Sequence, residues 1–312
     1  MLGRHGGNLF WMARYLERSE NNARRIQAVL HYALTRKDEG MEEWLSIANT
    51  ANLQGAFSEI NTSYSIDHVI NYVLRDKDNA NSVISLMTKA RQNGRSVRTA
   101  LTQEVWQSLN ESWMACDAAL RRQVNIRDLP IILENIVKGS SVFRVALYGT
   151  MLHNDIFNFL RLGTYIERAD NTARLINLKY HRLLPTAAVI GGGVDQSQWE
   201  VLLRSLAAWR SYNWLGKGRL NPIGVADFLI FDERMPRSLC FCYKEIQSNL
   251  SDLEAAYARQ YPSGRLSNKM CQGLIEGKQN ESHRQDLRDF IGQQIMLNNS
   301  LSETLHDDFN LI

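Results

Sequence analysis

Apolar residues recur at helical spacing along most of the chain. Near its start, the spacing of one helix face (i, i+3, i+4, i+7) is followed by Leu9, Met12, Leu16, Ala23, Ile26 and Leu30. No segment shows sustained alternation of apolar and polar residues with β-branched enrichment and turn signals, as strands do. The pattern therefore predicts an all-α fold.

The same spacing, together with residues that favour the starts and ends of helices, predicts where the helices lie. Helices are predicted over residues 8–36, 44–57, 67–74, 80 to past Trp113 with a break near Gly94, 128–149, 153–184, 198–213, 225–231, 236–259 and 285–305. Asp128 and Pro130 fit a cap and a first-turn position. The clearest break is 186–197, which carries three consecutive glycines and no helical period.

Composition agrees with long helices. The chain has five prolines in 312 residues, well below the average of about 5%, and proline inside a helix breaks it. A net charge of +3 is too small to indicate nucleic-acid binding. No stretch reads as a secretory signal or a membrane span. With four cysteines and no disulfide framework, we expect a cytoplasmic protein that binds neither nucleic acid nor membrane.

An internal repeat is visible at an offset of 150. Residues 8–26, NLFWMARYLERSENNARRI, and 158–176, NFLRLGTYIERADNTARLI, share eight identities in 19 positions, where unrelated segments would share about one. Downstream, YVLRDKDNANSV resembles FLIFDERMPRSL at an offset of 156. We predict one domain over 1–312, a helical bundle of two duplicated halves, about 1–150 and 151–312, related by a pseudo-twofold axis.

The repeated helix carries a polar stripe. Its members are Glu17, Arg18, Asn21 and Arg24 in the first copy and Glu167, Arg168, Asn171 and Arg174 in the second. One interpretation is a solvated helix face with i,i+4 ion pairs. The other is a shared role, either as a buried network between the halves or as an Arg/Glu cleft that binds a carboxylate or phosphate. These eight residues are the binding candidates.

A second repeated motif precedes a helix in each half. It places Asp76 and Ser82 in one copy and Asp232, Pro236, Arg237 and Ser238 in the other. We interpret it as a helix junction, with Ser238 bonded to exposed amides, Pro236 in the first turn and Asn79 as a cap in the first copy. A nucleophilic Ser238 is the alternative, but no elbow or Ser-x-x-Lys motif surrounds it.

Motifs for other chemistry are missing from the sequence. The histidines form no HExxH motif and there is no Walker A or GxGxxG sequence, so we predict no metal, no cofactor and no identifiable catalytic residue. Cys240 and Cys242 are expected to be buried thiols. The aromatic and basic segment 209–222, WRSYNWLGKGRLNP, is predicted to be a loop and a candidate partner or ligand surface.

Four segments together resemble a known family. They are NLFWMARYLERSENNARRI, GTYIERADNTAR, ARQNGRSVRTALTQEVWQSLN (90–110) and DFLIFDERMPRSLCFC (227–242), and over nearly the whole chain they resemble the bacterial alpha-E family, an all-helical domain of unknown function. The resemblance implies that its motif residues are Glu17, Arg18, Glu167, Arg168, Asp76, Ser82, Asp232, Pro236, Arg237 and Ser238.

The resemblance also implies partners. Alpha-E proteins are usually found beside circularly permuted ATP-grasp proteins and transglutaminase-like proteases, so an accessory subunit in peptide or amide-bond formation or modification is the leading hypothesis. The alternative is an enzyme that uses Glu17 and Glu167 as acid–base groups and Arg18 and Arg168 as clamps. A peptide or amino-acid-derived ligand and a homo-oligomer both stay open.

Overall fold

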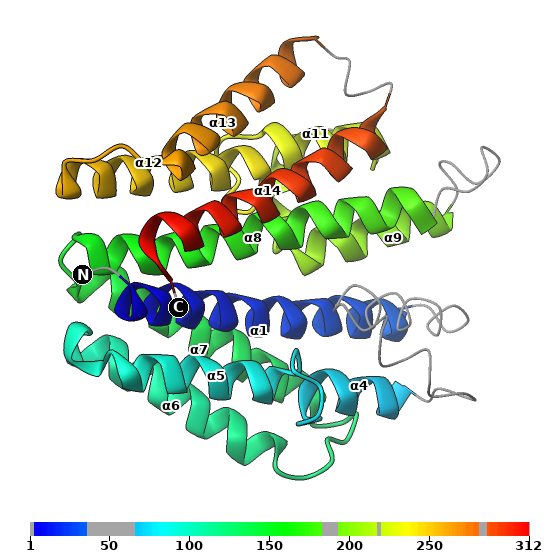
Figure 1. Ribbon diagram of the computed structural model, residues 1–312. Coiled ribbons are helices and arrows are strands. Elements are labelled where there is room, and N and C mark those ends of the chain that lie inside the picture. Colours follow the sequence, from blue (N-terminus) through cyan, green and yellow to red (C-terminus); the bar gives the residue numbers. More distant parts are fainter. Residues whose placement is uncertain (1–2, 36–65, 183–192, 217–219, 281–285, 312) are drawn as a thin grey trace. The chain divides into compact units, whose positions relative to one another are not determined.

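The computed structural model describes residues 3–35, 66–182, 193–216, 220–280 and 286–311 (Figure 1). Every regular element in these ranges is a helix, which confirms the all-α prediction. The elements are α1 (Arg4–Thr35), α4 (Ile66–Leu74), α5 (Val83–Ser96), a 3-10 turn (Arg98–Ala100), α6 (Gln103–Leu120), α7 (Leu129–Thr150), α8 (Asp155–Arg182), α9 (Gly193–Ser205), α10 (Trp209–Trp214), α11 (Pro222–Phe231), α12 (Leu239–Tyr257), α13 (Pro262–Asn280) and α14 (Leu287–Phe309). None of the described helices is both long enough and apolar enough to cross a membrane.

One predicted helix break is confirmed and two predicted boundaries are wrong. The break expected near Gly94 is present, since α5 ends at Ser96, and α6 begins at Gln103 after Thr102, whose Oγ1 accepts the Val105 amide. The helix expected over 198–213 is two helices, since Ala207 adopts a left-handed conformation with φ of 52° between them. The glycine-rich break also ends earlier than expected, as α9 begins at Gly193.

Some predictions concern residues outside the described ranges, and one helix of the structure was not predicted. The helix expected over 44–57 and the first part of the 186–197 break fall outside the described ranges. Helix α13 was not predicted, because its core face carries small residues, Ser263, Gly264 and Ser267, that interrupt the apolar period. Asp128 stands at the cap position of α7, but its side chain makes no capping bond.

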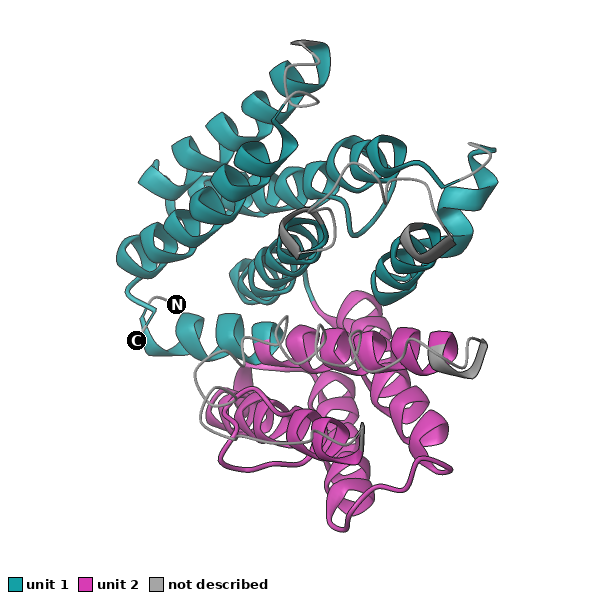
Figure 2. Ribbon diagram, turned by 90° about the vertical axis from the view of Figure 1, so that its right-hand side faces the viewer, with its two compact units in different colours: residues 1–14, 152–312 teal, residues 15–151 magenta. Residues whose placement is uncertain are grey.

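The described chain divides into two compact units (Figure 2). Unit 1 contains residues 1–14 and 152–312, and unit 2 contains residues 15–151. The boundary between Met151 and Leu152 falls where the first copy of the sequence repeat ends and the second begins. Helix α1 contributes residues to both units. The single-domain prediction and the pseudo-twofold axis are not tested by this division and stay predictions.

In unit 1, α8 packs against α12 and α14. The antiparallel contact of α8 with α14 is marked by Phe159, whose ring meets that of Phe309 edge-on at 5.3 Å, and by Asn298, whose side chain donates to the Ile166 carbonyl at 3.2 Å. At Gly163, an added Cβ would overlap the backbone carbonyl oxygen of Phe10 in α1. Helix α1 at Phe10 and helix α8 at Gly163 therefore approach each other so closely that only glycine fits at position 163.

In unit 2, α6 packs against both α5 and α7. The buried face of α7 recurs in α14 of unit 1 at an offset of 158: Leu133, Ile136, Ser140, Phe143 and Leu147 correspond to Ile291, Gln294, Asn298, Leu301 and Leu305. The two units thus use the same helix face at the same positions. The duplication itself stays a prediction, and this correspondence supports it.

The Gly163 contact predicts a stability difference between two glycine substitutions. Gly163→Ala should lower the free energy of unfolding by about 1–3 kcal/mol, because the new methyl group forces α1 and α8 apart. Gly149→Ala in α7 has no atom within 4 Å of the new methyl and should be neutral or stabilising by up to about 1 kcal/mol. Urea unfolding measures both, and equal midpoints for the two variants would refute the close packing.

Candidate functional site

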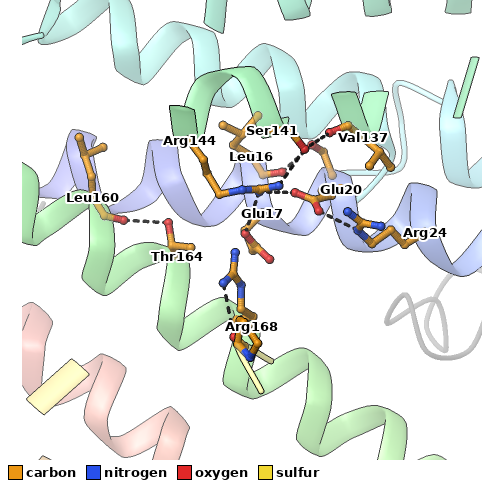
Figure 3. A network of polar contacts seen from close by, with 12 residues as sticks. Leu16, Glu17, Glu20, Arg24, Val137, Ser141, Arg144, Leu160, Thr164 and Arg168 are labelled. Atoms are coloured by element: carbon orange, nitrogen blue, oxygen red, sulfur yellow. Dashed lines mark hydrogen bonds and ion pairs between the residues drawn. The ribbon is translucent and has the colours of Figure 1, made fainter. Parts of the chain in front are cut away.

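The repeated polar stripe of α1 is a buried ion network in unit 2. The side chain of Glu20 is fully buried and that of Glu17 is 2% exposed. Arg144 of α7 pairs with both carboxylates, through a short contact to Glu20 and at 3.6 Å from Glu17 Oε2 (Figure 3). Arg24 Nε donates to the other oxygen of Glu20 at 2.7 Å, and Ser141 Oγ accepts from Arg144 at 3.2 Å. Each carboxylate therefore has a guanidinium partner.

The equivalent stripe of α8 forms a network inside unit 1. Glu167, 3% exposed, pairs with Arg14 of α1 at 3.1 Å. Arg14 also donates to Ser302 Oγ at 2.9 Å, and Ser302 stands at the position of α14 that Arg144 occupies in α7. Asp170 pairs with Arg174 at 2.7 Å, as Glu20 does with Arg24. The second copy thus keeps the buried glutamate, but the arginine that pairs with it comes from α1, whereas the partner of Glu17 comes from α7.

The arginine of each Glu-Arg motif reaches a junction loop, the one before α5 in unit 2 and the one before α12 in unit 1. Arg18 donates to the Asn81 side chain at 3.2 Å, and Arg168 to the Pro236 carbonyl at 3.4 Å. One turn later, the equivalent residues make equivalent bonds: Asn22 donates to the Asn81 carbonyl at 2.9 Å, and Thr172 donates to the Arg237 carbonyl at 2.7 Å. These bonds fix the helix junction to the motif helix.

The Asp-x5-Ser motif is a junction, as predicted. Ser82 accepts the Ser85 amide at 3.3 Å and Ser238 the Phe241 amide at 3.0 Å, so each serine is the N-cap of its helix. Asp76 and Asp232 each accept the amide two residues later at 2.9 Å, which shapes the loop. Since these groups are used in capping, nothing about Ser238 indicates an activated nucleophile.

Two details of the junction were predicted wrongly. Asn79 is not a helix cap, because Ser82 holds that position; its side chain instead accepts the Asn81 amide at 2.9 Å and donates to the Tyr72 carbonyl at 3.0 Å. Pro236 is not in the first turn of α12, since that helix begins at Leu239, after Ser238. Arg237 between them is buried.

The solvated-face interpretation of the stripe is wrong for most of its residues. Five of the eight stripe residues are buried, and Arg18, Arg24 and Arg174 are partly exposed. Arg144, which completes the unit 2 network, was missed, because it lies 124 residues from Glu20 and belongs to no repeated motif. The predicted cleft between the two stripes concerns the placement of the two units and stays a prediction.

Chemically, the networks resemble structural ion pairs more than an acid–base site. A general base must reach its substrate, and the motif glutamates are almost completely buried and paired with arginines. Within the described ranges, no group of three or more His, Cys, Asp or Glu side chains could hold a metal ion. The enzyme hypothesis stays a prediction.

The segment 209–222 is not simply a loop. Its first residues form α10, in which Tyr212 is buried against Phe228 with ring centroids 5.5 Å apart. Trp214 at the end of this helix is highly exposed. Residues 217–219 lie outside the described ranges, so the candidate surface stays a prediction that rests on Trp214.

Together, the helices and the two Glu-Arg networks define a class: an all-helical protein whose recurring motif is buried. The chain matches, over residues 1–309, the alpha-E family, described as a predicted alpha-helical domain with a conserved ER motif. This protein therefore belongs to the alpha-E family.

Known relatives add little about activity. Two uncharacterised proteins, one from Mycobacterium bovis and one from Mycobacterium tuberculosis, are each 21% identical over 273 residues. The match covers 82% of this chain but 30% of either relative, so the chain spans less than a third of the length of the curated relatives it matches. No solved structure matches the chain significantly.

The unit 2 network predicts a large effect for Arg144. Arg144→Met should lower the free energy of unfolding by about 3–5 kcal/mol, because it leaves Glu17 and Glu20 buried without this partner. Arg121→Met is the matched control, since its i,i+4 pair with Asp117 is exposed and should change stability by at most about 1 kcal/mol. Unfolding of both variants by guanidinium chloride measures the two changes in stability. Similar small losses of stability in the two variants would contradict the prediction.

Burial predicts that the thiols are unreactive in the native protein. All four cysteines are buried and free, and burial raises the pKa of Cys116 to about 12 and that of Cys271 to about 11. Because the thiolate is the reactive form, a thiol-specific disulfide reagent at pH 8 should label none of them quickly. After denaturation it should label all four. Rapid labelling of the folded protein would show that the cores of both units open readily.

Proposed function

We propose that this protein is a cytoplasmic, non-catalytic accessory subunit that docks an ATP-grasp-type ligase, and works with it and a transglutaminase-like protease in forming or modifying a peptide or amide-linked product. The family to which the chain belongs supplies this context. Two features of the molecule support the docking role: the burial of its motif residues and an exposed apolar surface on α7.

That surface, here called the α7 stripe, consists of Val142, Val145 and Tyr148. All three are exposed, and Val145 is 73% exposed. They project from one side of a helix whose opposite side forms the core of unit 2. Single exposed apolar residues are ordinary, but a cluster on one helix side indicates an interaction surface.

Unit 1 provides an internal comparison for the stripe. The residues of α14 that correspond to Val142, Val145 and Tyr148 at the same offset of 158 are Ser300, Glu303 and His306, and all three are also exposed. The fold therefore places these positions in solvent in both units but does not require them to be apolar. This contrast is the observation that carries the docking proposal.

The occupant we propose is the ligase polypeptide and not a second copy of this chain. In a symmetric dimer the same three side chains would meet one another, which falls short of the roughly 800 Å² that each partner of a stable complex buries. In both mycobacterial relatives, most of the polypeptide lies outside the region that matches this chain. A domain of this kind is thus found covalently joined to a longer protein, which favours a protein partner.

The test is a binding titration with the purified ATP-grasp-type ligase of the same organism. Val145→Glu should weaken the affinity at least about tenfold, because it places a charge in the apolar contact. Met296→Glu introduces the same charge at an exposed apolar position of α14 and should leave the affinity unchanged. Absence of binding by the native protein, or equal affinities for the two variants, would reject the proposal, and light scattering of the protein alone reports a homodimer.

A further inference from the structure

Unit 2 contains a cavity of about 480 Å³ that none of the motif residues lines. It lies where α6 ends and α7 begins, and the loop between these helices forms much of its wall. Its volume is in the range of small-molecule sites. The residues around it divide into an apolar set and a polar set.

The wall of this cavity is bonded to the last turn of α4 and to Arg75, which follows that helix. Arg75 donates from Nε to the Leu120 carbonyl at 3.2 Å and from Nη2 to the Arg121 carbonyl at 3.4 Å. Asn71 Oδ1 accepts the Val124 amide at 3.5 Å. Because the loop backbone is fixed by these bonds, a ligand would meet a preformed surface and would lose less affinity to loop ordering.

The polar side of the cavity carries two arginines. Arg121 and Arg122 line it together with a single carboxylate, that of Asp128. The Arg121 guanidinium is paired with Asp117 at 3.0 Å and is 74% exposed, while Arg122 is exposed. The Arg122 guanidinium suits a carboxylate ligand, because a guanidinium binds a carboxylate through two parallel hydrogen bonds.

The amides at the start of α7 contribute little to such a site. The Leu129 amide already donates to the Asn125 carbonyl at 3.1 Å, and Pro130 has no amide hydrogen. The donors must therefore be side chains: the two arginines and the amide groups of Gln123 and Asn125, which also line the cavity.

The remaining lining is apolar and small. It comes from Ala118 and Ala119 of α6, Val124 of the loop and Ile132 of α7. We infer that this cavity binds a carboxylate attached to an apolar body, such as the C-terminal residues of a peptide with an apolar side chain. Arg122 binds the carboxylate, with Arg121 beside it, and the apolar side chain lies against Ala119 and Ile132.

This inference takes from the proposed function only the choice of a peptide as the ligand class, and the two can fail separately. Ligase binding is measured through the α7 stripe, whereas peptide binding is measured with the protein alone. A protein that fails to bind the ligase can still bind the peptide, and the reverse also holds.

The experiment is isothermal titration calorimetry of the full chain with N-acetyl-alanyl-leucine as the free acid, with its C-terminal amide, and with inorganic phosphate. The free acid should bind, and the amide should bind at least about tenfold more weakly, because it lacks the charge that pairs with Arg122. Arg122→Gln should weaken binding of the acid by a similar factor. Arg95→Gln, at an exposed arginine in the last turn of α5 that does not line the cavity, should bind as the native protein does.

Three results would overturn the assignment. Equal affinities for acid and amide would show that the carboxylate is not recognised. Equal affinities of the Arg122→Gln and Arg95→Gln variants would place binding elsewhere. Tighter binding of phosphate than of the free acid would make this a phosphate site and not a carboxylate site. Because both substituted arginines are exposed, neither variant should fail to fold.

Discussion

An ionised carboxylate that is removed from water costs several kcal/mol unless a charged group is paired with it. Glu20, with no exposed side-chain surface, and Glu17 are paired with arginines that come from α7 and, for Glu20, also from the next turn of α1. The positions of α7 and α1 within unit 2 are therefore tied to the pairing, as are those of α8 and the start of α1 within unit 1 through Glu167 and Arg14. The arginine of each motif then donates a hydrogen bond to the junction before α5 in unit 2 or before α12 in unit 1. Packing of the apolar faces supplies the bulk of the stability, and the ion pairs specify which helices meet.

This role separates the family motif from the surfaces proposed to meet other molecules. Residues buried in paired networks have little contact with solvent, so the proposed recognition uses other parts of the chain. The α7 stripe offers apolar side chains at positions that are polar in α14, and the cavity at the end of α6 offers arginines beside small apolar residues. Both lie in unit 2, although the motif is present in both units. The two units thus both contain a buried Glu-Arg network and differ in the side chains that α7 and α14 present to solvent.

Much of this fold could be predicted from the sequence, because long helices with a regular apolar face leave a clear period. The six apolar positions of α1 that the period selected are all buried. The role of Ser238 at the start of α12 follows from the repeated Asp-x5-Ser motif, although Asn79 was expected at the cap position of α5 that Ser82 holds. Helix α13 was not predicted, since small residues replace apolar ones on its core face. The burial of the Glu-Arg stripe also could not be predicted from one sequence. A helical period shows that polar residues share one side of a helix, but it does not show whether water or another helix covers that side. Arg144 could not be assigned because its partners are distant in sequence and it has no counterpart in the second copy, where Ser302 stands instead.

The central claim is that the buried glutamates are structural and that Arg144 is their necessary partner. A double-mutant cycle in equilibrium unfolding, with Glu20→Gln, Arg144→Met and the two combined, isolates the interaction between these side chains. The account predicts a coupling free energy of at least about 1 kcal/mol, with the double variant more stable than the sum of the single losses implies, since removing both charges leaves neither of the two buried without its partner. Additive losses, with a coupling near zero, would contradict it.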